Sequence, residues 1–266
     1  MNLNKPKVVN TNSHLKKLIQ RGYVIEPKLD GSRHILKNEN DQVTILRESG
    51  RIKNSQFPEI ADNVLLPSDT ILDGEVCYLK SDLVSDFYSV LPRENLMNQT
   101  RINLLSKELP LTFVAFDIIK YQGKDLSDLN YSTRREYLNK IQTNNNLKVI
   151  TNYNLDQYLE LDKTNMEGIV LKNPNANYNA DQFKFKFYIE TDFNVIGYTS
   201  ESRLISALEL ADQDNNYVGK CNYINYPQTK EYAEKLKGMI AVVKHQWTNN
   251  NKIKFPVLKE LRSRWN

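Results

Sequence analysis

The chain has 266 residues, which is enough for one large domain and a smaller second one. Apolar residues make up 40% of it, but no apolar run approaches the roughly 20 residues of a membrane-spanning helix. The two cysteines, Cys77 and Cys221, are distant in sequence and lack metal-type spacing. With no signal-peptide segment at the N-terminus, these features exclude membrane and disulfide-stabilised proteins and predict a cytoplasmic one. The net charge of +4 is compatible with a nucleic-acid partner without requiring one.

The first 190 residues alternate between short strand-like runs and a few amphipathic helices. Helices are expected at Ser13–Gln20, Ser132–Gln142 and Asn154–Lys163; the last two begin with capping residues and carry an apolar face. Runs rich in β-branched and aromatic residues predict strands at Tyr23–Lys28, His34–Lys37, Val43–Arg47, Thr70–Leu79, Leu111–Ile119, Leu147–Thr151, Gly168–Lys172 and Phe183–Tyr188. Many strands with a few inserted helices predict an α+β domain.

After about residue 190 the pattern changes to short strands with a single helix. The strands are expected at Phe193–Thr199, Arg203–Leu210, Tyr217–Cys221 and Met239–Lys244, the helix at Thr229–Lys237, and a basic tail follows. This pattern is typical of a small β-barrel of the oligonucleotide-binding type. We therefore place one domain at 1–189 and the barrel at 190–266.

The segment Glu26–Arg33, with the sequence EPKLDGSR, concentrates chemically active side chains. A lysine at a strand end, an Asp-Gly turn and an arginine that points back would form a compact phosphate site. The same octapeptide also fits an ordinary β-turn with flanking charges, since Asp-Gly is a common turn pair.

Acids, lysines and one aromatic residue recur at the ends of later strands. Glu75 lies in LDGEV, Phe116 precedes an acid in FVAFD, and Glu167 precedes a glycine in MEGIVLK. Lys184 and Lys186 share one face of the strand FKFKF, because side chains alternate along a strand. Taken singly, the acids could be solvated strand-end charges and Phe116 a core residue.

In this order the stretches resemble the covalent nucleotidyltransferases, the superfamily of ATP-dependent DNA ligases, RNA ligases and mRNA-capping enzymes. Its nucleophile motif, Lys-x-Asp-Gly-x-Arg, matches Lys28–Arg33 completely. The DNA ligases of the minimal bacterial, phage or viral type are the most similar. That similarity rests on Phe57–Ile60 (FPEI) and on Asp192–Tyr198, which is similar to the entry into a ligase oligonucleotide-binding domain.

The resemblance implies an ATP-dependent DNA ligase that seals nicks in double-stranded DNA as a monomer. It assigns the covalent attack on ATP to Lys28, the adenine amino group to Glu26, stacking on the base to Phe116, and Mg²⁺ or Mn²⁺ to Glu75 and Glu167. Glu75 could instead hold the ribose. The residues it implies for nucleotide binding are Glu26, Lys28, Arg33, Arg47, Glu75, Phe116, Glu167, Lys184, Lys186 and Arg262.

An attacking lysine must be neutral, whereas an exposed one has a pKa near 10.4. We expect the positive charges of Arg33, Lys184 and Lys186 to lower the pKa of Lys28, with partial burial acting in the same direction.

Two motifs depart from the family pattern. The last motif, usually Arg-x-Asp-Lys, keeps Arg262 but continues as Ser263-Arg264-Trp265, and Arg47 stands one residue farther from Gly50 than usual. An RNA ligase, a capping-type nucleotidyltransferase, or a catalytically weakened nucleic-acid-binding protein with this fold therefore remain as alternatives.

Overall fold

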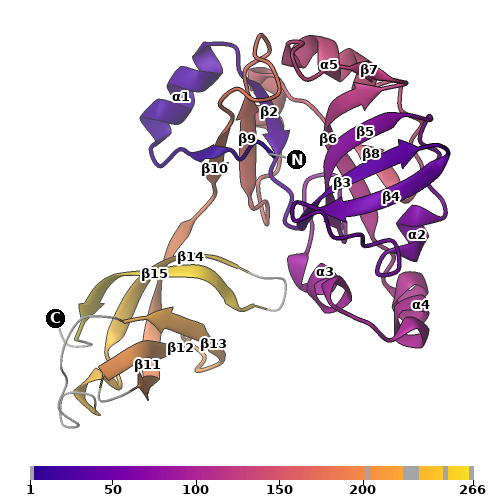
Figure 1. The fold of residues 1–266 in the computed structure, drawn as a ribbon. Helices are drawn as coiled ribbons and strands as arrows, with labels where there is room; N and C mark the ends of the chain where they lie inside the picture. The colour runs from indigo at the N-terminus through magenta and orange to yellow at the C-terminus, as the bar shows by residue number, and fades with distance from the viewer. Residues whose placement is uncertain (1–2, 202–203, 224–233, 248–250, 264–266) are drawn as a thin grey trace. The chain divides into compact units, whose positions relative to one another are not determined.

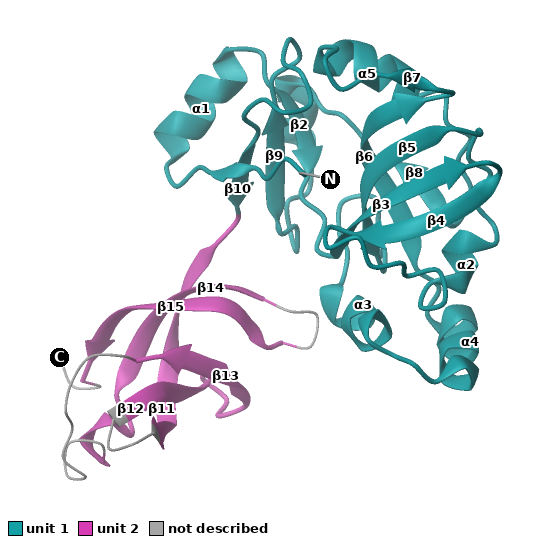
Figure 2. Cartoon of the chain, in the orientation of Figure 1, with its two compact units in different colours: residues 1–186 teal, residues 187–266 magenta. Residues whose placement is uncertain are grey.

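The computed structural model describes residues 3–201, 204–223, 234–247 and 251–263. The chain forms two compact units, Met1–Lys186 and Phe187–Asn266, shown in different colours in Figure 2. The boundary between the units lies three residues before the expected one at 189/190, which falls inside a strand of the second unit. None of the described helices is long and apolar enough to cross a bilayer.

The larger sheet of the first unit has six strands in the order β4-β3-β5-β6-β7, with β8 beside β6 (Figure 1). All neighbours are antiparallel except the β6–β8 pair. The core against this sheet contains Leu36, Leu72, Phe113 and Ile118, all fully buried. The strands are β3 (Ser32–Glu39), β4 (Gln42–Arg47), β5 (Thr70–Cys77), β6 (Thr112–Tyr121), β7 (Lys124–Asp125) and β8 (Leu147–Val149).

The smaller sheet of this unit has the order β1-β10-β9-β2. Its strands are β1 (Lys7–Val8), β2 (Val24–Pro27), β9 (Gly168–Lys172) and β10 (Phe183–Lys186). Because β2 belongs to this sheet and β3 to the larger one, the segment Lys28–Gly31 carries the chain from one sheet to the other. The predicted phosphate motif therefore lies at the crossing.

Within residues 3–186, the described part of the first unit, the helices are α1 (Asn12–Gln20), α2 (Pro58–Ala61), α3 (Phe87–Glu94), α4 (Gln99–Glu108), α5 (Tyr131–Leu138) and α6 (Leu155–Glu160). The helices α1, α5 and α6 correspond to the three expected ones, but α5 and α6 end earlier than expected. The expected cap of α5 at Ser132 is wrong, because the side chain that caps it is that of Asn130. Sequence reasoning missed α2, α3 and α4. The helix α3 has an internal proline, Pro92, which argues against a helix in the sequence, and α4 buries only Ile102 and so lacks a clear apolar stripe.

The second unit is a single antiparallel sheet in the order β13-β12-β11-β14-β15, whose outer strands β13 and β15 contact each other. Its strands are β11 (Ile189–Glu201), β12 (Leu204–Ala211), β13 (Tyr217–Asn222), β14 (Ile240–Trp247) and β15 (Ile253–Arg262). The helix expected at Thr229–Lys237 lies largely outside the described residues. The expected basic tail is wrong, because most of it is β15; the strand tolerates Pro256 since it stands at the edge of the ladder.

Stability of the first unit depends on the buried pair of Arg134 on α5 and Asp117 on β6, which are joined at 2.8 Å and 3.0 Å. Replacing Arg134 with methionine should lower the free energy of unfolding by about 3–5 kcal/mol, because the Asp117 carboxylate loses its main counter-charge inside the protein. Urea denaturation followed by circular dichroism would measure this. Lys148→Met, which breaks the exposed pair with Asp82, should shift the midpoint much less. Equal shifts for the two variants would contradict the assignment.

Candidate active site

A cavity of about 280 Å³ lies in the first unit and is lined by strands of both its sheets and by the segment preceding β1. This volume is close to the lower end of typical ligand pockets, roughly 300 Å³. Six of the residues expected to bind nucleotide line it: Glu26, Lys28, Arg33, Glu75, Phe116 and Lys184. The structure therefore brings together side chains that are up to 158 positions apart in the chain, from Glu26 to Lys184.

Lys28 follows β2 directly, and its backbone N–H donates to the carbonyl of Gly168 at 2.9 Å. Glycine is required at two positions close to it. A β-carbon on Gly31 would lie 2.4 Å from the carbonyl oxygen of Val76, and one on Gly168 would lie 2.2 Å from that of Phe185. The Asp-Gly pair thus permits a close approach of β5, a role beyond that of a surface turn.

The ammonium group of Lys28 forms an ion pair with Glu167, with 2.6 Å between Nζ and Oε2. Lys186 contacts the other oxygen of the same carboxylate at 2.9 Å, although Lys186 does not line the cavity. Lys184 does line it, and burial together with the charges of Lys28 and Lys186 lowers the pKa of Lys184. The two lysines of β10 therefore have different surroundings, one facing the cavity and one bound to Glu167.

The expected lowering of the Lys28 pKa is wrong for the protein in this state. Burial does lower it, but the Glu167 charge, the hydrogen bond to Glu167 and the nearby Glu75 carboxyl act the other way, and the net pKa is raised. The same contacts with Lys28 and Lys186 lower the pKa of Glu167 despite its burial. The lysine is thus held in its protonated form.

Glu75, on β5, faces the same cavity. Burial, opposed by the charge of Lys28 and reinforced by that of Glu167, raises the pKa of the Glu75 carboxyl to about 8. Most of the Glu75 population is therefore protonated at pH 7.

Arg33 is held rigidly by groups that sequence reasoning did not identify. Its Nε and one terminal nitrogen donate to the Asp73 carboxylate at 3.0 Å and 2.6 Å, and the other terminal nitrogen donates to the Asn4 carbonyl at 2.6 Å. Tyr178 also donates to Asp73 at 2.6 Å. The sequence feature that could have indicated this contact is Asp73, an acid at a buried position of β5, two residues before Glu75.

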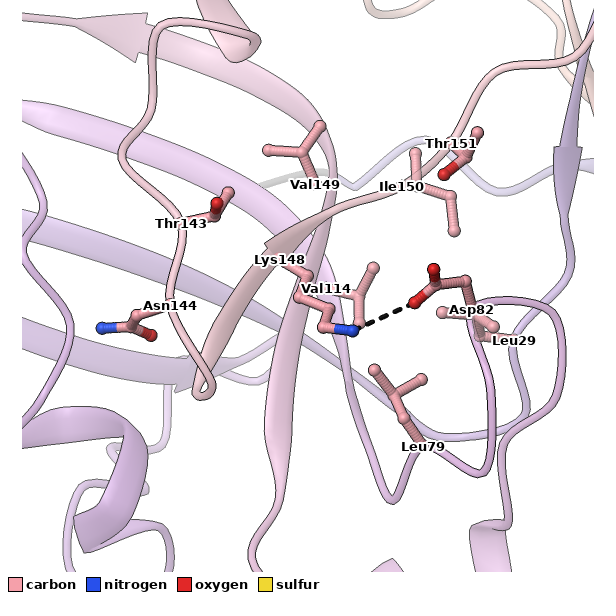
Figure 3. A pocket seen from close by; sticks show the side chains of 10 residues that line it. All are labelled: Leu29, Leu79, Asp82, Val114, Thr143, Asn144, Lys148, Val149, Ile150 and Thr151. Atoms are coloured by element: carbon pink, nitrogen blue, oxygen red, sulfur yellow. Dashed lines mark hydrogen bonds and ion pairs between the residues drawn. The ribbon is translucent and has the colours of Figure 1, made fainter.

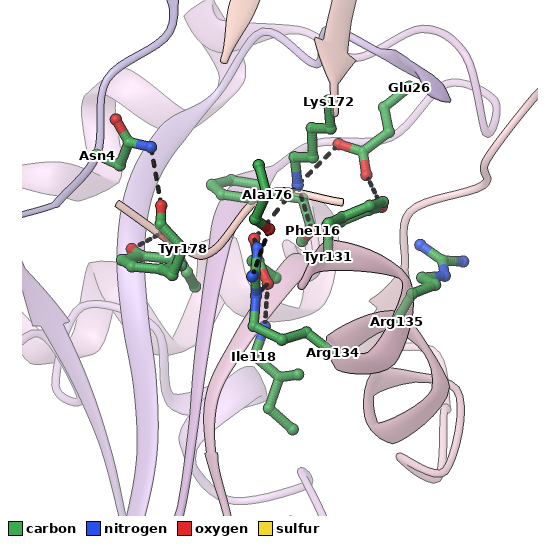
Figure 4. A network of polar contacts seen from close by, with 12 residues as sticks. Asn4, Glu26, Phe116, Ile118, Tyr131, Arg134, Arg135, Lys172, Ala176 and Tyr178 are labelled. Atoms are coloured by element: carbon green, nitrogen blue, oxygen red, sulfur yellow. Dashed lines mark hydrogen bonds and ion pairs between the residues drawn. The ribbon is translucent and has the colours of Figure 1, made fainter. Parts of the chain in front are cut away.

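At the other end of the cavity, Glu26 is fixed by two partners (Figure 4). Lys172 lies 3.1 Å from its Oε2, and the hydroxyl of Tyr131 donates to its Oε1. Lys172 also donates to the backbone carbonyl of Phe116 at 2.5 Å and lies 5.0 Å from the centre of that ring. Phe116 is only partly buried, unlike its neighbours on β6, so its ring is available to a ligand. The sequence feature that could have indicated a role for Lys172 is its place as the charged residue at the end of the apolar strand β9.

Four expected residues do not line this cavity: Glu167 and Lys186, which pair with each other beside Lys28, and Arg47 and Arg262. Arg47, at the end of β4, lies 3.5 Å from the carboxylate of Glu94. The pocket wall beside it is instead formed by Glu48, which is paired with Lys5 at 2.8 Å. Arg262 belongs to the second unit, ends β15 and donates to Asp192.

The expected metal ligands are Glu75 and Glu167. Across the described ranges, no group of three or more histidine, cysteine or acidic side chains is placed to hold a metal ion. Mg²⁺ commonly takes one or two carboxylates and completes its shell with water and substrate phosphates. The two carboxyls near Lys28 fit an ion bound together with a nucleotide, and they do not form an all-protein metal site.

A second cavity, of about 390 Å³, shares Leu29 and Ile150 with the first (Figure 3). Its polar lining includes Asp82 and Lys148, which are paired with each other at 3.0 Å. None of the residues expected from the sequence lines it. Volume alone therefore does not identify the functional site; the side chains around Lys28 do.

Comparisons with known proteins identify the family of the chain. The sequence pattern of the ATP dependent DNA ligase domain matches residues 3–187. The chain is 27% identical over 264 residues to the SPbeta prophage-derived DNA ligase-like protein LigB of Bacillus subtilis (strain 168), covering 90% of this chain and 93% of that protein. It is 28% identical over 189 residues to DNA ligase C of Mycobacterium tuberculosis, covering 65% of this chain and about half, 52%, of that relative.

Among solved structures, the chain is similar to a Lig E DNA ligase whose structure is described as DNA binding with a minimal scaffold. The match covers 98% of this chain and 99% of the Lig E chain, with a TM-score of 0.68 and 15% sequence identity. The predicted fold class is confirmed: a nucleotidyltransferase domain is followed by an oligonucleotide-binding barrel. The chain belongs to the ATP-dependent DNA ligase family.

The ion pair between Lys28 and Glu167 predicts how the lysine titrates without nucleotide. In Glu167→Gln the pKa of Lys28 should fall, because the charge that raises it is gone while burial and Lys186 remain. Below that pKa, each unit of decrease increases the neutral fraction roughly tenfold. The measurement is the acetylation rate of Lys28 between pH 7 and 10, read by mass spectrometry; the profile should move to lower pH.

The matched control is Glu39→Gln, which removes the acid from the exposed pair of Lys37 and Glu39 (2.7 Å) on the same unit. This variant should leave the Lys28 profile in place. A Glu167→Gln profile that superimposes on the wild-type one would show that Glu167 does not hold the lysine protonated.

Proposed function

We propose that this protein seals nicks in duplex DNA by way of a covalent lysyl–AMP intermediate on Lys28. One observation carries the proposal: Lys28 reaches into a cavity that has a cationic region at Arg33 and Lys184 and a partly apolar region at Phe116 and Val170. A nucleoside triphosphate has a matching division, since its phosphates are anionic and its base is flat and apolar on its faces.

In the first step the Lys28 Nζ attacks the α-phosphorus of ATP, an N–P bond forms, and the bond to the pyrophosphate oxygen breaks. The lysine must first lose a proton and its pairing with Glu167. Lys184 and Arg33 oppose the charge of the phosphates, and the contacts of Arg33 with Asp73 and Asn4 keep its guanidinium in place. Positioning and charge neutralisation are the main contributions a protein makes to phosphoryl transfer.

A Mg²⁺ ion held by Glu75 and Glu167 together with phosphate oxygens would supply further neutralisation of the phosphate charge. Glu167 would then exchange its partner, from Lys28 to the metal. In the alternative in which Glu75 holds the ribose, its raised pKa would make it a hydrogen-bond donor below about pH 8.

In the later steps the AMP moves from Lys28 to the 5′-phosphate of a nick, which breaks the N–P bond, and the 3′-hydroxyl then attacks that phosphorus and releases AMP. We assign the covalent chemistry to a domain at 1–189 and part of the DNA contact to the barrel at 190–266. Arg262 would aid only the first step. In a monomer of two small domains, contacts to the DNA phosphates should supply most of the affinity, so binding to nicked DNA should weaken strongly as the salt concentration rises.

Incubation with α-labelled ATP and Mg²⁺ tests the covalent step. The wild-type chain should become labelled, Lys28→Ala should lose the label completely because no other amine occupies its place, and Lys37→Ala, on the exposed pair with Glu39, should keep it. Gel electrophoresis after denaturation measures the covalent label. A label that survives in Lys28→Ala would refute Lys28 as the nucleophile, and an unlabelled wild type would favour a catalytically weakened nucleic-acid-binding protein.

The substrate is tested by adding nicked duplexes to the labelled protein. Nicked DNA should discharge the label and yield a sealed strand. Discharge by nicked RNA alone would indicate an RNA ligase, and labelling by GTP in preference to ATP would indicate a capping-type enzyme.

A further inference from the structure

Tyr131, the first residue of α5, touches the site without lining the cavity. Its ring is buried, with 2% exposure, and its hydroxyl donates to Oε1 of Glu26. Tyr131 does not belong to the motifs that point to the site in the sequence. The contact is between residues 105 positions apart: α5 packs against β6, and its first residue lies beside Glu26 and Lys172 (Figure 4).

We propose that Tyr131 is a positioning residue that, with Lys172, fixes the Glu26 carboxylate and so makes the site prefer a 6-aminopurine to a 6-oxopurine nucleotide. The inference rests on the proposed function in one respect, namely that the cavity takes a purine nucleoside triphosphate. It goes further by naming a residue outside the cavity as a determinant of which base is accepted.

The geometry gives each carboxylate oxygen its own donor. Lys172 lies 3.1 Å from Oε2 and also donates to the Phe116 carbonyl at 2.5 Å, which holds its ammonium group in place. Tyr131 serves Oε1. Two anchored oxygens fix the plane of the carboxyl group, and each keeps a lone pair for a ligand.

A carboxylate held in this way is an acceptor only. It can receive a hydrogen bond from the 6-amino group of adenine, whereas the 6-oxo group of hypoxanthine or guanine presents lone pairs to it. A site with a buried polar group that the wrong ligand leaves without a partner discriminates strongly against that ligand.

Tyr131 is itself held in place by its neighbours. Its hydroxyl lies 3.1 Å from Oδ1 of Asn152, which also accepts from Arg135 at 2.9 Å. Lys172 and Arg134 lie 4.8 Å and 5.7 Å from the ring centre. Burial and the adjacent Glu26 carboxylate raise the pKa of Tyr131 well above its ordinary value, so the hydroxyl keeps the proton that it donates.

The test compares ATP with inosine triphosphate (ITP), which carries a 6-oxo group. The change is Tyr131→Phe, which keeps the buried ring and removes only the hydroxyl. Binding of each nucleotide to the full chain is measured by isothermal titration calorimetry. The ratio of the two dissociation constants, which favours ATP in the wild type, should fall roughly tenfold, the order expected when a hydrogen bond to a charged group is lost.

The matched control is Tyr137→Phe on the same helix, whose hydroxyl bonds to Lys124 at 3.0 Å, away from the cavity. It should leave the ratio unchanged. General loosening of α5 would weaken ATP and ITP alike and would not move the ratio, so the ratio separates positioning from a structural role. In a Glu26→Gln background the Tyr131→Phe change should have no further effect, because the group it positions is gone.

An unchanged ratio in Tyr131→Phe, or an equal effect of Tyr131→Phe in the Glu26→Gln background, would overturn the inference. Because calorimetry needs no chemistry, the result is independent of nick sealing. A ratio that falls in Tyr131→Phe, together with a wild type that takes no label on Lys28, would refute the proposed function and support this inference. A labelled wild type, together with a ratio that Tyr131→Phe leaves unchanged, would do the opposite.

Discussion

A charge buried between two sheets must be compensated, and this constraint organises the first unit. Arg33 lies against Asp73 and Lys172 against Glu26, which join strands that are distant in the chain, and Arg134 on α5 lies against Asp117 on β6. Removing one member of such a pair leaves the other without its counter-charge in a medium of low polarity, which is strongly unfavourable. The contacts that stabilise this unit are therefore the same contacts that orient the walls of its cavity.

Lys28 and Glu167 also compensate each other's charge, but in this pair a ligand can take the place of one partner. Lys28 is partly exposed, and its partner also contacts Lys186. When a triphosphate enters, its negative charges compete with Glu167 for the lysine, and Lys186 remains beside the acid. The protein is thus stable with a protonated nucleophile, and in our proposal deprotonation becomes favourable only when the nucleotide rearranges these charges.

Glu26 and Glu75 illustrate how surroundings separate two identical side chains. Glu26 has a cation and a phenol hydroxyl as donors, so it is compensated where it is buried. Glu75 faces the cavity near Lys28 but also near Glu167, and its pKa rises to about 8. One acid is therefore suited to accept a hydrogen bond from a base, and the other can change its protonation as ligands enter.

The sequence by itself determined most of the longer strands, the family, and a set of candidate residues, because alternation and short motifs are local properties. It missed α2, α3, α4 and β15, whose patterns are weak or interrupted by proline. Only the tertiary structure decided that Arg47 contacts Glu94, that Lys28 is held protonated, and that Asp73, Lys172 and Tyr131 support the site. These contacts depend on which charged side chains come together in the folded chain. The spacing of residues along the sequence does not specify the distance between such side chains in space.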